Sequence, residues 1–500
     1  MNQDYELLES ILEKSFAYNV ALSLLSWDNS TLAPRRSSEL TAKAIGILNM
    51  QSYYLTVNPE VEALLERLIQ PDVLSTLKPH QQAIVKKMWK SSAELKKIPP
   101  QEIQEYSELC AIAGNIWEEA KINNDYASYK DTLSKLIEFQ KRFASYAKKD
   151  DQTIYDYILD NNEEGFTSQI LDDYFDKLRK NIVPLMKKIK EKGLCIDDSF
   201  IKLPFPIEKQ KAFCDLLASH IGFDFERGVV AESAHPFTLS LHNRDVRITN
   251  HFYESDPTSA MFTVIHEGGH AIYEMNIDDA LTGTPAASPS MGAHESQSRL
   301  FENNIGRSKA FWEPLYGRLT QHFPEELKNV SLDEFYRAIN KSQASLIRIH
   351  ADELSYSLHI MIRYEIEREI FAGTVSMDEL PALWNQKYEE YLGITPPNDS
   401  DGILQDSHWS FGGFGYFPSY AIGNAVASQL MHTIEQHMDV EELLRKGNLS
   451  PIVTFLKEHI HQYGGSKNVN EFLMETTGEP FNPDYYINYL TRKYSDLYQL

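Results

Sequence analysis

The chain has 500 residues, of which 42% are hydrophobic and 24% are charged, and its formal net charge is −24. This composition is typical of a folded globular protein and excludes a disordered chain. The negative charge argues against non-specific binding to nucleic acids or to anionic membranes, because the protein repels their phosphate groups.

The N-terminal segment and the cysteines indicate in which cellular compartment the protein is expected. The first 20 residues include acidic side chains and no continuous apolar segment, which argues against a secretory signal, and no later stretch has the ~18 apolar residues that cross a bilayer. Cys110, Cys195 and Cys214 are far apart, so neither a disulfide framework nor a thiolate zinc site is expected. We therefore expect a cytoplasmic protein that does not bind membranes.

Helical periodicity dominates the chain. Apolar residues recur every three or four positions from residue 8 to residue 20, and similar patterns fill residues 129–149 and 168–192. The pairs Pro99-Pro100 and Pro396-Pro397 mark breaks between helices. We therefore predict a mainly α-helical protein, with either two lobes or one large helical body.

Residues 235–252, HPFTLSLHNRDVRITNHF, differ from this pattern. β-branched or apolar residues alternate with polar residues on either side of the turn-forming Asn243. The alternation predicts a β-hairpin. An edge strand at this place could hold an extended peptide through backbone hydrogen bonds.

The next segment, TVIHEGGHAIYE at residues 263–274, has the pattern of a metal-binding helix. His266 and His270 are four residues apart, so their rings project from one helical face and can share a zinc ion. Glu267 lies about 100° around the helix, where its carboxylate can accept a proton from a metal-bound water.

Two adjacent glycines interrupt this helix, although each costs it about 1 kcal/mol relative to alanine. Gly269 lies about 60° to one side of the histidine face, where a side chain would crowd a third ligand or a substrate. Gly268 points away from that face, and the missing Cβ there lets another element pack closely. We expect Gly269→Leu to damage metal binding or peptide turnover.

A catalytic zinc site needs a third protein ligand and an open position for water. Tyr273 and Asn276 occupy the positions that hold a glycine and a histidine in metzincins, which excludes that arrangement. Glu295 is the preferred candidate, because it follows a turn-rich loop and lies near the start of a second helix. His294 and Glu302 are the alternatives.

Six short motifs stand in order along the chain: HPF (235–237), DVRIT (245–249), HEGGH (266–270), HESQ (294–297), IRIHAD (347–352) and GILQDSHW (402–409). Together they resemble the signature set of the carboxypeptidase Taq family of zinc metallocarboxypeptidases. The resemblance extends toward both ends of the chain, through WDNSTLAP (27–34), FGYFPSY (414–420) and GEPFNPDYYINYL (478–490).

The resemblance implies a fold, a ligand set and an activity. The fold is elongated, mainly helical and similar to that of neurolysin, with a deep groove and a small β-hairpin or sheet beside the active site. Residues 1–500 form one catalytic domain of two lobes, in which about residues 1–200 wall the groove and 235–430 hold the metal. His266, His270 and Glu295 match the zinc ligands, with cobalt as an alternative metal, and Glu267 matches the general base.

The family's members remove single residues from peptide C-termini with broad preference and are usually homodimers. Such an enzyme needs a receptor for the terminal carboxylate, and arginine suits it because its guanidinium binds a carboxylate through two parallel hydrogen bonds. The resemblance favours Arg348, which could instead pair with Asp352 four residues on. Arg247 is the second candidate, with Asp245 as its alternative partner.

Other motif residues are candidates for supporting roles. His408 and Tyr420 can stabilise the developing oxyanion, although Tyr420 could also be an ordinary buried aromatic residue. His235 can contact substrate or orient the hairpin. Asp406 and Asp352 can orient the zinc histidines.

Two other functions fit parts of this pattern. A zinc oligoendopeptidase of the same helical class would cleave peptides with amidated C-termini, which a carboxypeptidase should reject. A catalytically inactive peptide-binding scaffold is the more remote alternative, and the intact set of His266, Glu267, His270 and Glu295 counts against it.

Overall fold

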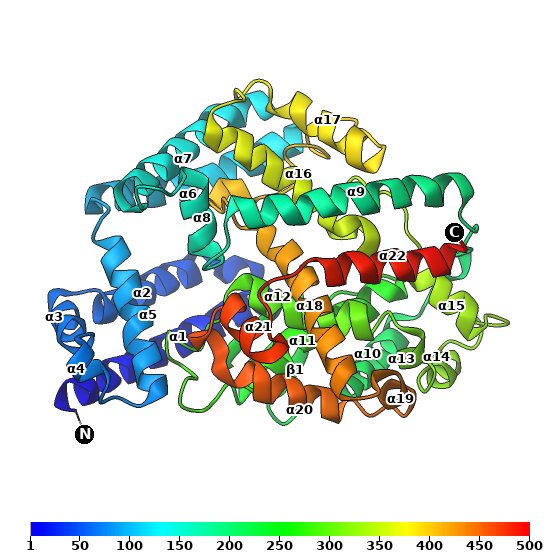
Figure 1. Cartoon of the computed structure of the whole chain (residues 1–500), viewed down its shortest axis with the longest axis horizontal. Coiled ribbons are helices and arrows are strands. Elements are labelled where there is room, and N and C mark those ends of the chain that lie inside the picture. The colour runs from blue at the N-terminus through cyan, green and yellow to red at the C-terminus, as the bar shows by residue number, and fades with distance from the viewer. Residues whose placement is uncertain (1) are drawn as a thin grey trace.

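The computed structural model describes residues 2–500 and contains one small sheet within a predominantly helical chain (Figure 1). Within the same residues, no helix combines the length and the apolar composition needed to cross a membrane.

The helices of the N-terminal part are α1 (Gln3–Thr31), α2 (Ser38–Thr56), α3 (Pro59–Leu68), α4 (Pro71–Leu74), α5 (Pro79–Leu95), α6 (Pro100–Asn123), α7 (Tyr126–Ala147), α8 (Ile154–Asn162), α9 (Ser168–Lys192) and α10 (Ile207–Ile221). The later helices are α11 (Pro257–Met275), α12 (Met291–Arg299), α13 (Lys309–Trp312), α14 (Tyr316–His322), α15 (Leu332–Ile339), α16 (Glu353–Ala372), α17 (Leu380–Leu392), α18 (Phe417–His437), α19 (Val440–Arg445), α20 (Ser450–His459), α21 (Val469–Thr477) and α22 (Asp484–Tyr498). Short helical turns are η1 (Arg35–Ser37), η2 (Ser199–Lys202), η3 (Leu300–Ile305), η4 (Arg348–His350), η5 (His408–Phe411) and η6 (His461–Ser466).

The helices predicted from apolar periodicity are confirmed as α1, α7 and α9. Each begins at a polar residue whose side chain accepts a hydrogen bond from a backbone N–H of the first turn, namely Asn2, Asp125 and Thr167. Such caps satisfy N–H groups that have no partner inside the helix.

The predicted hairpin is also confirmed. Strands β2 (Thr238–His242) and β3 (Asp245–Asn250) pair antiparallel around a turn at Asn243. A third strand, β1 (Gly228–Glu232), pairs parallel with β3 and gives the order β1–β3–β2. Strand β1 was not predicted from the sequence, because its apolar residues are adjacent and do not alternate with polar ones.

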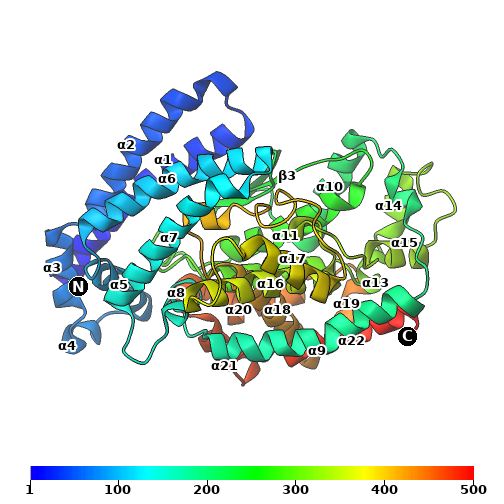
Figure 2. The same cartoon turned by 90° about the horizontal axis from the view of Figure 1, so that it is seen from above.

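The centre of the molecule is built around α11. This helix packs against α10, against strands β2 and β3, and against α12, which in turn packs along α18 (Figure 1). Fourteen of the 19 residues of α11 are buried, so its polar groups must meet protein partners or a bound ligand. Toward the C-terminus, α22 runs alongside α9 (Figure 2).

The expected fold class is confirmed in its main features, a mainly helical chain with a small sheet beside the histidine helix. The division into a groove wall of about residues 1–200 and a metal-binding part at 235–430 stays a prediction.

Candidate metal centre

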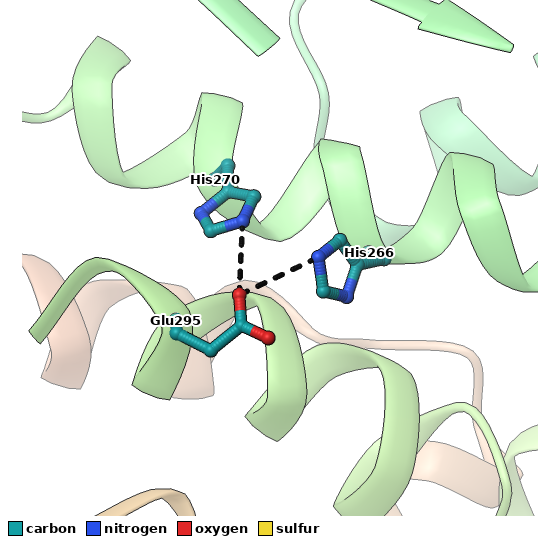
Figure 3. A group of neighbouring side chains, drawn as sticks. All are labelled: His266, His270 and Glu295. Atoms are coloured by element: carbon teal, nitrogen blue, oxygen red, sulfur yellow. Dashed lines mark ion pairs between the residues drawn. The ribbon is translucent and has the colours of Figure 1, made fainter. Parts of the chain in front are cut away.

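Three side chains predicted as metal ligands converge between α11 and α12. His266 and His270 project from one face of α11, and Glu295 points toward them from α12 (Figure 3). Glu295 Oε2 lies 3.6 Å from His266 Nε2 and 3.4 Å from His270 Nε2.

The spacing of these donor atoms fits a bound metal ion. Both distances exceed the ~2.7–3.2 Å of a good hydrogen bond from nitrogen to oxygen. Ligand atoms that lie about 2.0 Å from a tetrahedral zinc ion are roughly 3.3 Å from one another, close to what is seen here. Burial lowers the pKa of His270 to about 3, so its ring is neutral at pH 7 and Nε2 can donate a lone pair. Two imidazoles and one carboxylate leave room for a water molecule as fourth ligand.

Each histidine is held from behind by a hydrogen bond at its other ring nitrogen. With Nε2 free for an ion, His266 Nδ1–H donates to Glu302 Oε2 over 2.9 Å. His270 Nδ1–H donates in the same way to His294 Nδ1 over 2.6 Å, and His294 Nε2–H donates to Glu274 over 2.8 Å. Such partners fix the tautomer and the orientation of a ligating histidine. The two alternative ligands, His294 and Glu302, therefore lie behind the histidines.

Glu295 is oriented by neighbours on its own helix. Arg299 Nε donates to Oε1 over 2.7 Å, which leaves Oε2 directed at the histidines, and the Ser298 hydroxyl donates to Oε2 over 3.0 Å. Burial alone would raise the pKa of Glu295, but the charge of Arg299 holds it well below its usual value. The carboxylate is therefore ionised and able to bind a cation.

Glu267 lies beside the histidines and meets the edge of the sheet. The hydroxyl of Thr238, the first residue of β2, donates to Glu267 Oε2 over 2.6 Å. Burial raises the pKa of the Glu267 carboxyl, and the neighbouring His266 and the hydrogen bond from Thr238 oppose that rise. The hairpin thus positions this carboxylate next to the metal-binding histidines.

The two glycines of α11 lie against different neighbours. A Cβ atom at Gly269 would come within 2.9 Å of the backbone of Gln297 and Ser298, on the helix that carries Glu295. A Cβ atom at Gly268 would come within 2.4 Å of the side chain of Ile221, at the end of α10. The close packing expected at Gly268 is therefore present. Gly269, where a side chain was expected to crowd a third ligand or a substrate, lies against the backbone of α12 and sets the distance between α11 and α12.

Arg348 lies in a second charged cluster. Its Nε and Nη2 donate to Asp406 Oδ1 over 3.0 and 2.9 Å, and Arg363 Nε donates to Asp406 Oδ2 over 2.7 Å. Burial would raise the pKa of Asp406, but Arg363 and Arg348 hold it well below its usual value. Two alternatives from the sequence are therefore wrong. Arg348 pairs with Asp406 and not with Asp352, and Asp406 does not orient the zinc histidines.

Asp352 has a local role instead. Its side chain caps α16 and accepts hydrogen bonds from the backbone N–H groups of Leu354 and Ser355 over 2.9 and 3.2 Å. It therefore orients neither zinc histidine, contrary to the sequence-based interpretation.

His408 and Tyr420 lie together beside this cluster. His408 Nε2 is 3.2 Å from the Tyr420 hydroxyl, and the Arg348 guanidinium lies 5.0 Å from the centre of the Tyr420 ring. Burial and the charge of Arg348 lower the pKa of His408 to about 4, so the ring is neutral at pH 7. Arg348 also donates to the Tyr356 hydroxyl over 3.2 Å.

The ring of Tyr356 connects this cluster to the metal site. The guanidinium of Arg299, which holds Glu295, lies 4.4 Å from the centre of the Tyr356 ring. The residues predicted to bind the substrate terminus are therefore linked by direct contacts to the third metal ligand.

Arg247 and His235 are placed differently. Arg247 makes a two-point ion pair with Asp245, with both N–O distances at 2.8 Å, and its guanidinium lies 5.6 Å from the ring of Trp27 in α1. The pairing with Asp245 is the alternative that the sequence left open. His235 is exposed, and its backbone carbonyl accepts a hydrogen bond from Ser233.

Sequence reasoning missed several residues of the site. The contact of Arg299 with Glu295 had a signal, because the two residues are four apart on one helix. The seven-residue spacing of Glu295 and Glu302 likewise predicts that both side chains lie on the same face of a helix. Thr238 and Tyr356 had no such signal, since their contacts join separate elements.

Comparisons with known proteins agree with this geometry. The sequence matches the family described as carboxypeptidase Taq (M32) metallopeptidase over residues 7–494. It is 44% identical over 492 residues to Carboxypeptidase 1 of Bacillus subtilis (strain 168), with 98% of each chain covered. It is 34% identical over 504 residues to Thermostable carboxypeptidase 1 of Pyrococcus furiosus, again with 98% of each chain covered.

The fold also matches that of a solved structure. The structure of the M32 carboxypeptidase from Deinococcus radiodurans R1 matches with a TM-score of 0.96 and 33% identity, and the match covers 100% of both chains. The protein therefore belongs to the carboxypeptidase Taq (M32) family and is a metallocarboxypeptidase with a His/His/Glu metal site.

Proposed function

We propose that this carboxypeptidase releases single amino acids from peptide C-termini with broad preference, and that its metal is zinc, with cobalt as an alternative. The observation that carries the choice of metal is the donor set, because two imidazoles and one carboxylate at tetrahedral spacing are typical of catalytic zinc. Bound by His266, His270 and Glu295, the ion would lower the pKa of a water molecule and polarise the carbonyl of the scissile bond.

Glu267 acts as general base in this proposal. Its carboxylate lies next to His266 on α11, and the Thr238 hydroxyl fixes one of its oxygens. From this position it accepts a proton from the attacking water and returns that proton to the leaving amine. Thr238 orients Glu267 and takes no part in the proton transfer itself.

Arg348 binds the terminal carboxylate of the peptide. The alternation of side chains along a strand supports Arg348 over Arg247. Ile248 pairs with Thr238, whose side chain reaches Glu267 on α11, so Arg247, the residue before Ile248 in β3, points to the opposite face of the sheet. Arg348, in contrast, is in contact with Tyr356 and Tyr420.

Tyr420 and His408 support the carbonyl oxygen as negative charge develops on it. The Tyr420 hydroxyl is a neutral donor, since burial and the nearby Tyr356 raise its pKa well above the usual value. His408 Nε2 lies 3.2 Å from that hydroxyl and fixes its orientation. A neutral donor held in place stabilises an oxyanion at little reorganisation cost. His235 contacts the substrate from the loop before β2.

Mass spectrometry of a mixed peptide digest tests the activity. We expect stepwise loss of single C-terminal residues, arrest by a chelator, and recovery on adding zinc or cobalt. A peptide with an amidated C-terminus should stay intact, because it has no carboxylate to offer Arg348. Internal cleavage of that peptide, or turnover that persists in chelator, would contradict the proposal.

The homodimer and the cytoplasmic location stay predictions. The three cysteines are all free, which is usual in a reducing compartment. Sedimentation equilibrium of the metal-loaded protein measures the assembly state.

A further inference from the structure

A buried glutamate outside the metal site lies at the start of the helix that carries the third ligand. Glu163 follows α8 as its C-terminal cap residue and is only 2% exposed. Its Oε1 accepts a hydrogen bond from the backbone N–H of Gly292, in the first turn of α12. A carboxylate at this end of a helix is favoured, because unpaired N–H groups and the helix dipole make the N-terminus positive.

The same carboxylate is near the start of α18. The hydroxyls of Ser419, in the first turn of α18, and of Ser290, the N-cap of α12, lie close enough to lower the pKa of Glu163 against the larger effect of burial. Among residues 2–500, Glu163 Oε2 and Ser419 Oγ are both buried without a hydrogen-bond partner. The Glu163 carboxylate therefore accepts a hydrogen bond from the first turn of α12 and lies close to the first turn of α18.

The fit around Glu163 depends on the absence of a side chain at Gly292. A Cβ atom at this position would lie 2.9 Å from the Cδ, Oε1 and Oε2 atoms of Glu163. Real Cβ atoms do not approach other atoms so closely in well-packed interiors. Gly292 and Glu163 are therefore matched in shape as well as by their hydrogen bond.

A second close contact lies one helical turn further along both helices. Glu295 is three residues after Gly292, and Gly423 is four residues after Ser419. A Cβ atom at Gly423 would come within 2.8 Å of Cβ and Cγ of Glu295. Two successive layers, Glu163 with Gly292 and Ser419, then Glu295 with Gly423, therefore fix α12 against α18. A shift in the first layer is passed to the second, because neither has space to absorb it.

We propose that Glu163 is a positioning residue for the metal site, which sets the place of Glu295 by holding the first turn of α12 next to that of α18. The inference rests on the proposed role of Glu295 as third ligand. Glu163 itself contacts neither metal nor substrate, so its effect is exerted through the helices that it joins.

Metal affinity is the measurement that tests this role. Competition between the metal-free protein and a chromogenic zinc chelator gives the affinity without any need for activity. We expect Glu163→Ala to weaken zinc binding by about 10-fold or more, as for other residues that orient a ligand from outside the coordination sphere. Glu163→Gln keeps an oxygen that can accept from Gly292 and should retain most of the affinity.

Asp156 provides a matched control on the same helix. Its carboxylate accepts from the backbone N–H and the hydroxyl of Ser168, at the start of α9, and α9 carries no residue of the proposed site. Asp156→Ala and Glu163→Ala should both lower the thermal unfolding midpoint of the metal-free protein, but Asp156→Ala should leave zinc affinity unchanged. Equal zinc affinities for Glu163→Ala and the unaltered protein would overturn the inference, as would an equal loss in both alanine variants.

A double-mutant cycle gives an independent test if Glu163→Ala folds poorly. Gly292→Ala alone should weaken zinc binding, because its Cβ collides with Glu163. In the Glu163→Ala background the collision is gone, so the same substitution should have little further effect. An equal effect of Gly292→Ala in both backgrounds would also overturn the inference.

The Glu295→Gln variant distinguishes a failure of the proposed metal site from a failure of the positioning role of Glu163. If this variant binds zinc normally, Glu295 is not a ligand and the proposed site itself fails. If it loses zinc while the Glu163 variants retain it, the site stands and the positioning role of Glu163 fails.

Discussion

The two charged clusters of the site differ in how their charges are balanced. In the metal cluster, the inward-facing atoms of His266, His270 and Glu295 face one another at distances too long for good hydrogen bonds. In the second cluster, the guanidinium groups of Arg348 and Arg363 share the single carboxylate of Asp406. The first cluster therefore presents lone-pair donors that a metal ion can bridge, and the second carries one positive charge more than its carboxylate neutralises.

This difference indicates which ligand each cluster accepts. A buried cluster of lone-pair donors is stabilised by a metal ion, and a buried excess of guanidinium groups is stabilised by an anion. In the proposed function, a peptide with a free C-terminus supplies that anion, and the two clusters together would select a terminal residue with the last peptide bond near the metal. Four experiments examine this division of roles.

The largest effect is expected at the metal cluster for Glu267→Gln. The variant keeps the shape of the side chain and loses the proton acceptor, so kcat should fall by roughly 10²- to 10⁴-fold. Metal content should not change, because Glu267 is not among the three ligands. Steady-state kinetics and metal analysis of the purified variant check both statements. A fall of less than tenfold would reject the role as general base, and loss of the metal would make Glu267 a ligand.

Arg348→Lys tests the second cluster. Lysine keeps the charge but loses the planar guanidinium that binds a carboxylate at two points. We expect kcat/KM for peptides with a free C-terminus to fall by about 10- to 100-fold, the value of a hydrogen bond or two to a charged group.

Arg363→Lys is the control for this experiment. Arg363 binds the same aspartate, but its side chain is 0% exposed, against 8% for Arg348. The Arg363→Lys substitution should therefore lower the stability of the protein without a comparable fall in kcat/KM. An equal loss of kcat/KM in both variants would mean that the aspartate network is structural and that the carboxylate binds elsewhere.

Gly269→Ala and Gly268→Ala test how the metal cluster is spaced. At Gly269 the new Cβ meets backbone atoms of α12, which cannot move aside, so we expect a loss of about 1–3 kcal/mol in unfolding free energy and weaker zinc binding. At Gly268 the new Cβ meets a flexible isoleucine side chain, and the better helix propensity of alanine partly offsets the contact. Urea unfolding and zinc titration of both variants measure the difference, and equal effects would contradict it.

The smallest effect is expected in the pH dependence of stability, through Glu367, which binds the loop that carries Asp406 and His408. Glu367 accepts hydrogen bonds from Trp409 and Gly415 of this loop and from Tyr155, and burial still raises its pKa to about 7. Because an unfolded glutamate has a pKa near 4.3, the native state binds a proton that the unfolded chain releases between about pH 4.3 and 7. The stabilisation from this group is therefore complete below pH 4.3 and declines as pH rises through 7.

Glu367→Gln cannot titrate and isolates this contribution. From pH 5 to pH 7, the urea midpoint of the unaltered protein should fall relative to that of the variant. Above pH 7 the difference between the two midpoints should become constant. A difference that is the same at every pH would mean that the pKa of Glu367 is not raised.

The predictable parts of the site are those set by spacing within one element. The four-residue spacing of His266 and His270 fixed their common face, and alternation predicted the hairpin that carries Thr238. Glu295 could be named as a candidate ligand from the sequence, because a loop of turn residues precedes the short helix that carries it. For the histidine pair and the hairpin, the geometry of a helix or a strand was enough. For Glu295 it was not, because His294 and Glu302 stayed open as alternatives until the family resemblance favoured Glu295.

The parts that could not be predicted depend on how separate elements pack. Asp352, four residues away, was the alternative partner for Arg348 in the sequence, but the structure pairs Arg348 with Asp406, at a separation of 58 residues. Glu163 and Gly292 are 129 residues apart, and no local pattern connects them. A charged residue gives no local sign of which distant opposite charge it meets, so such pairs require the assembled fold.

The contact of Gly423 with Glu295 has a consequence for the order of assembly during folding. His266 and His270 are close neighbours in sequence and can bind a metal weakly in an incompletely folded chain. We expect tight binding only once α12 is seated against α18, whose first residue is Phe417 and whose Gly423 contacts Glu295. A nascent or truncated chain that ends before this helix contains all three ligand side chains and still lacks the surface that aligns them. Metal uptake with native affinity therefore reports that the chain has folded past residue 423.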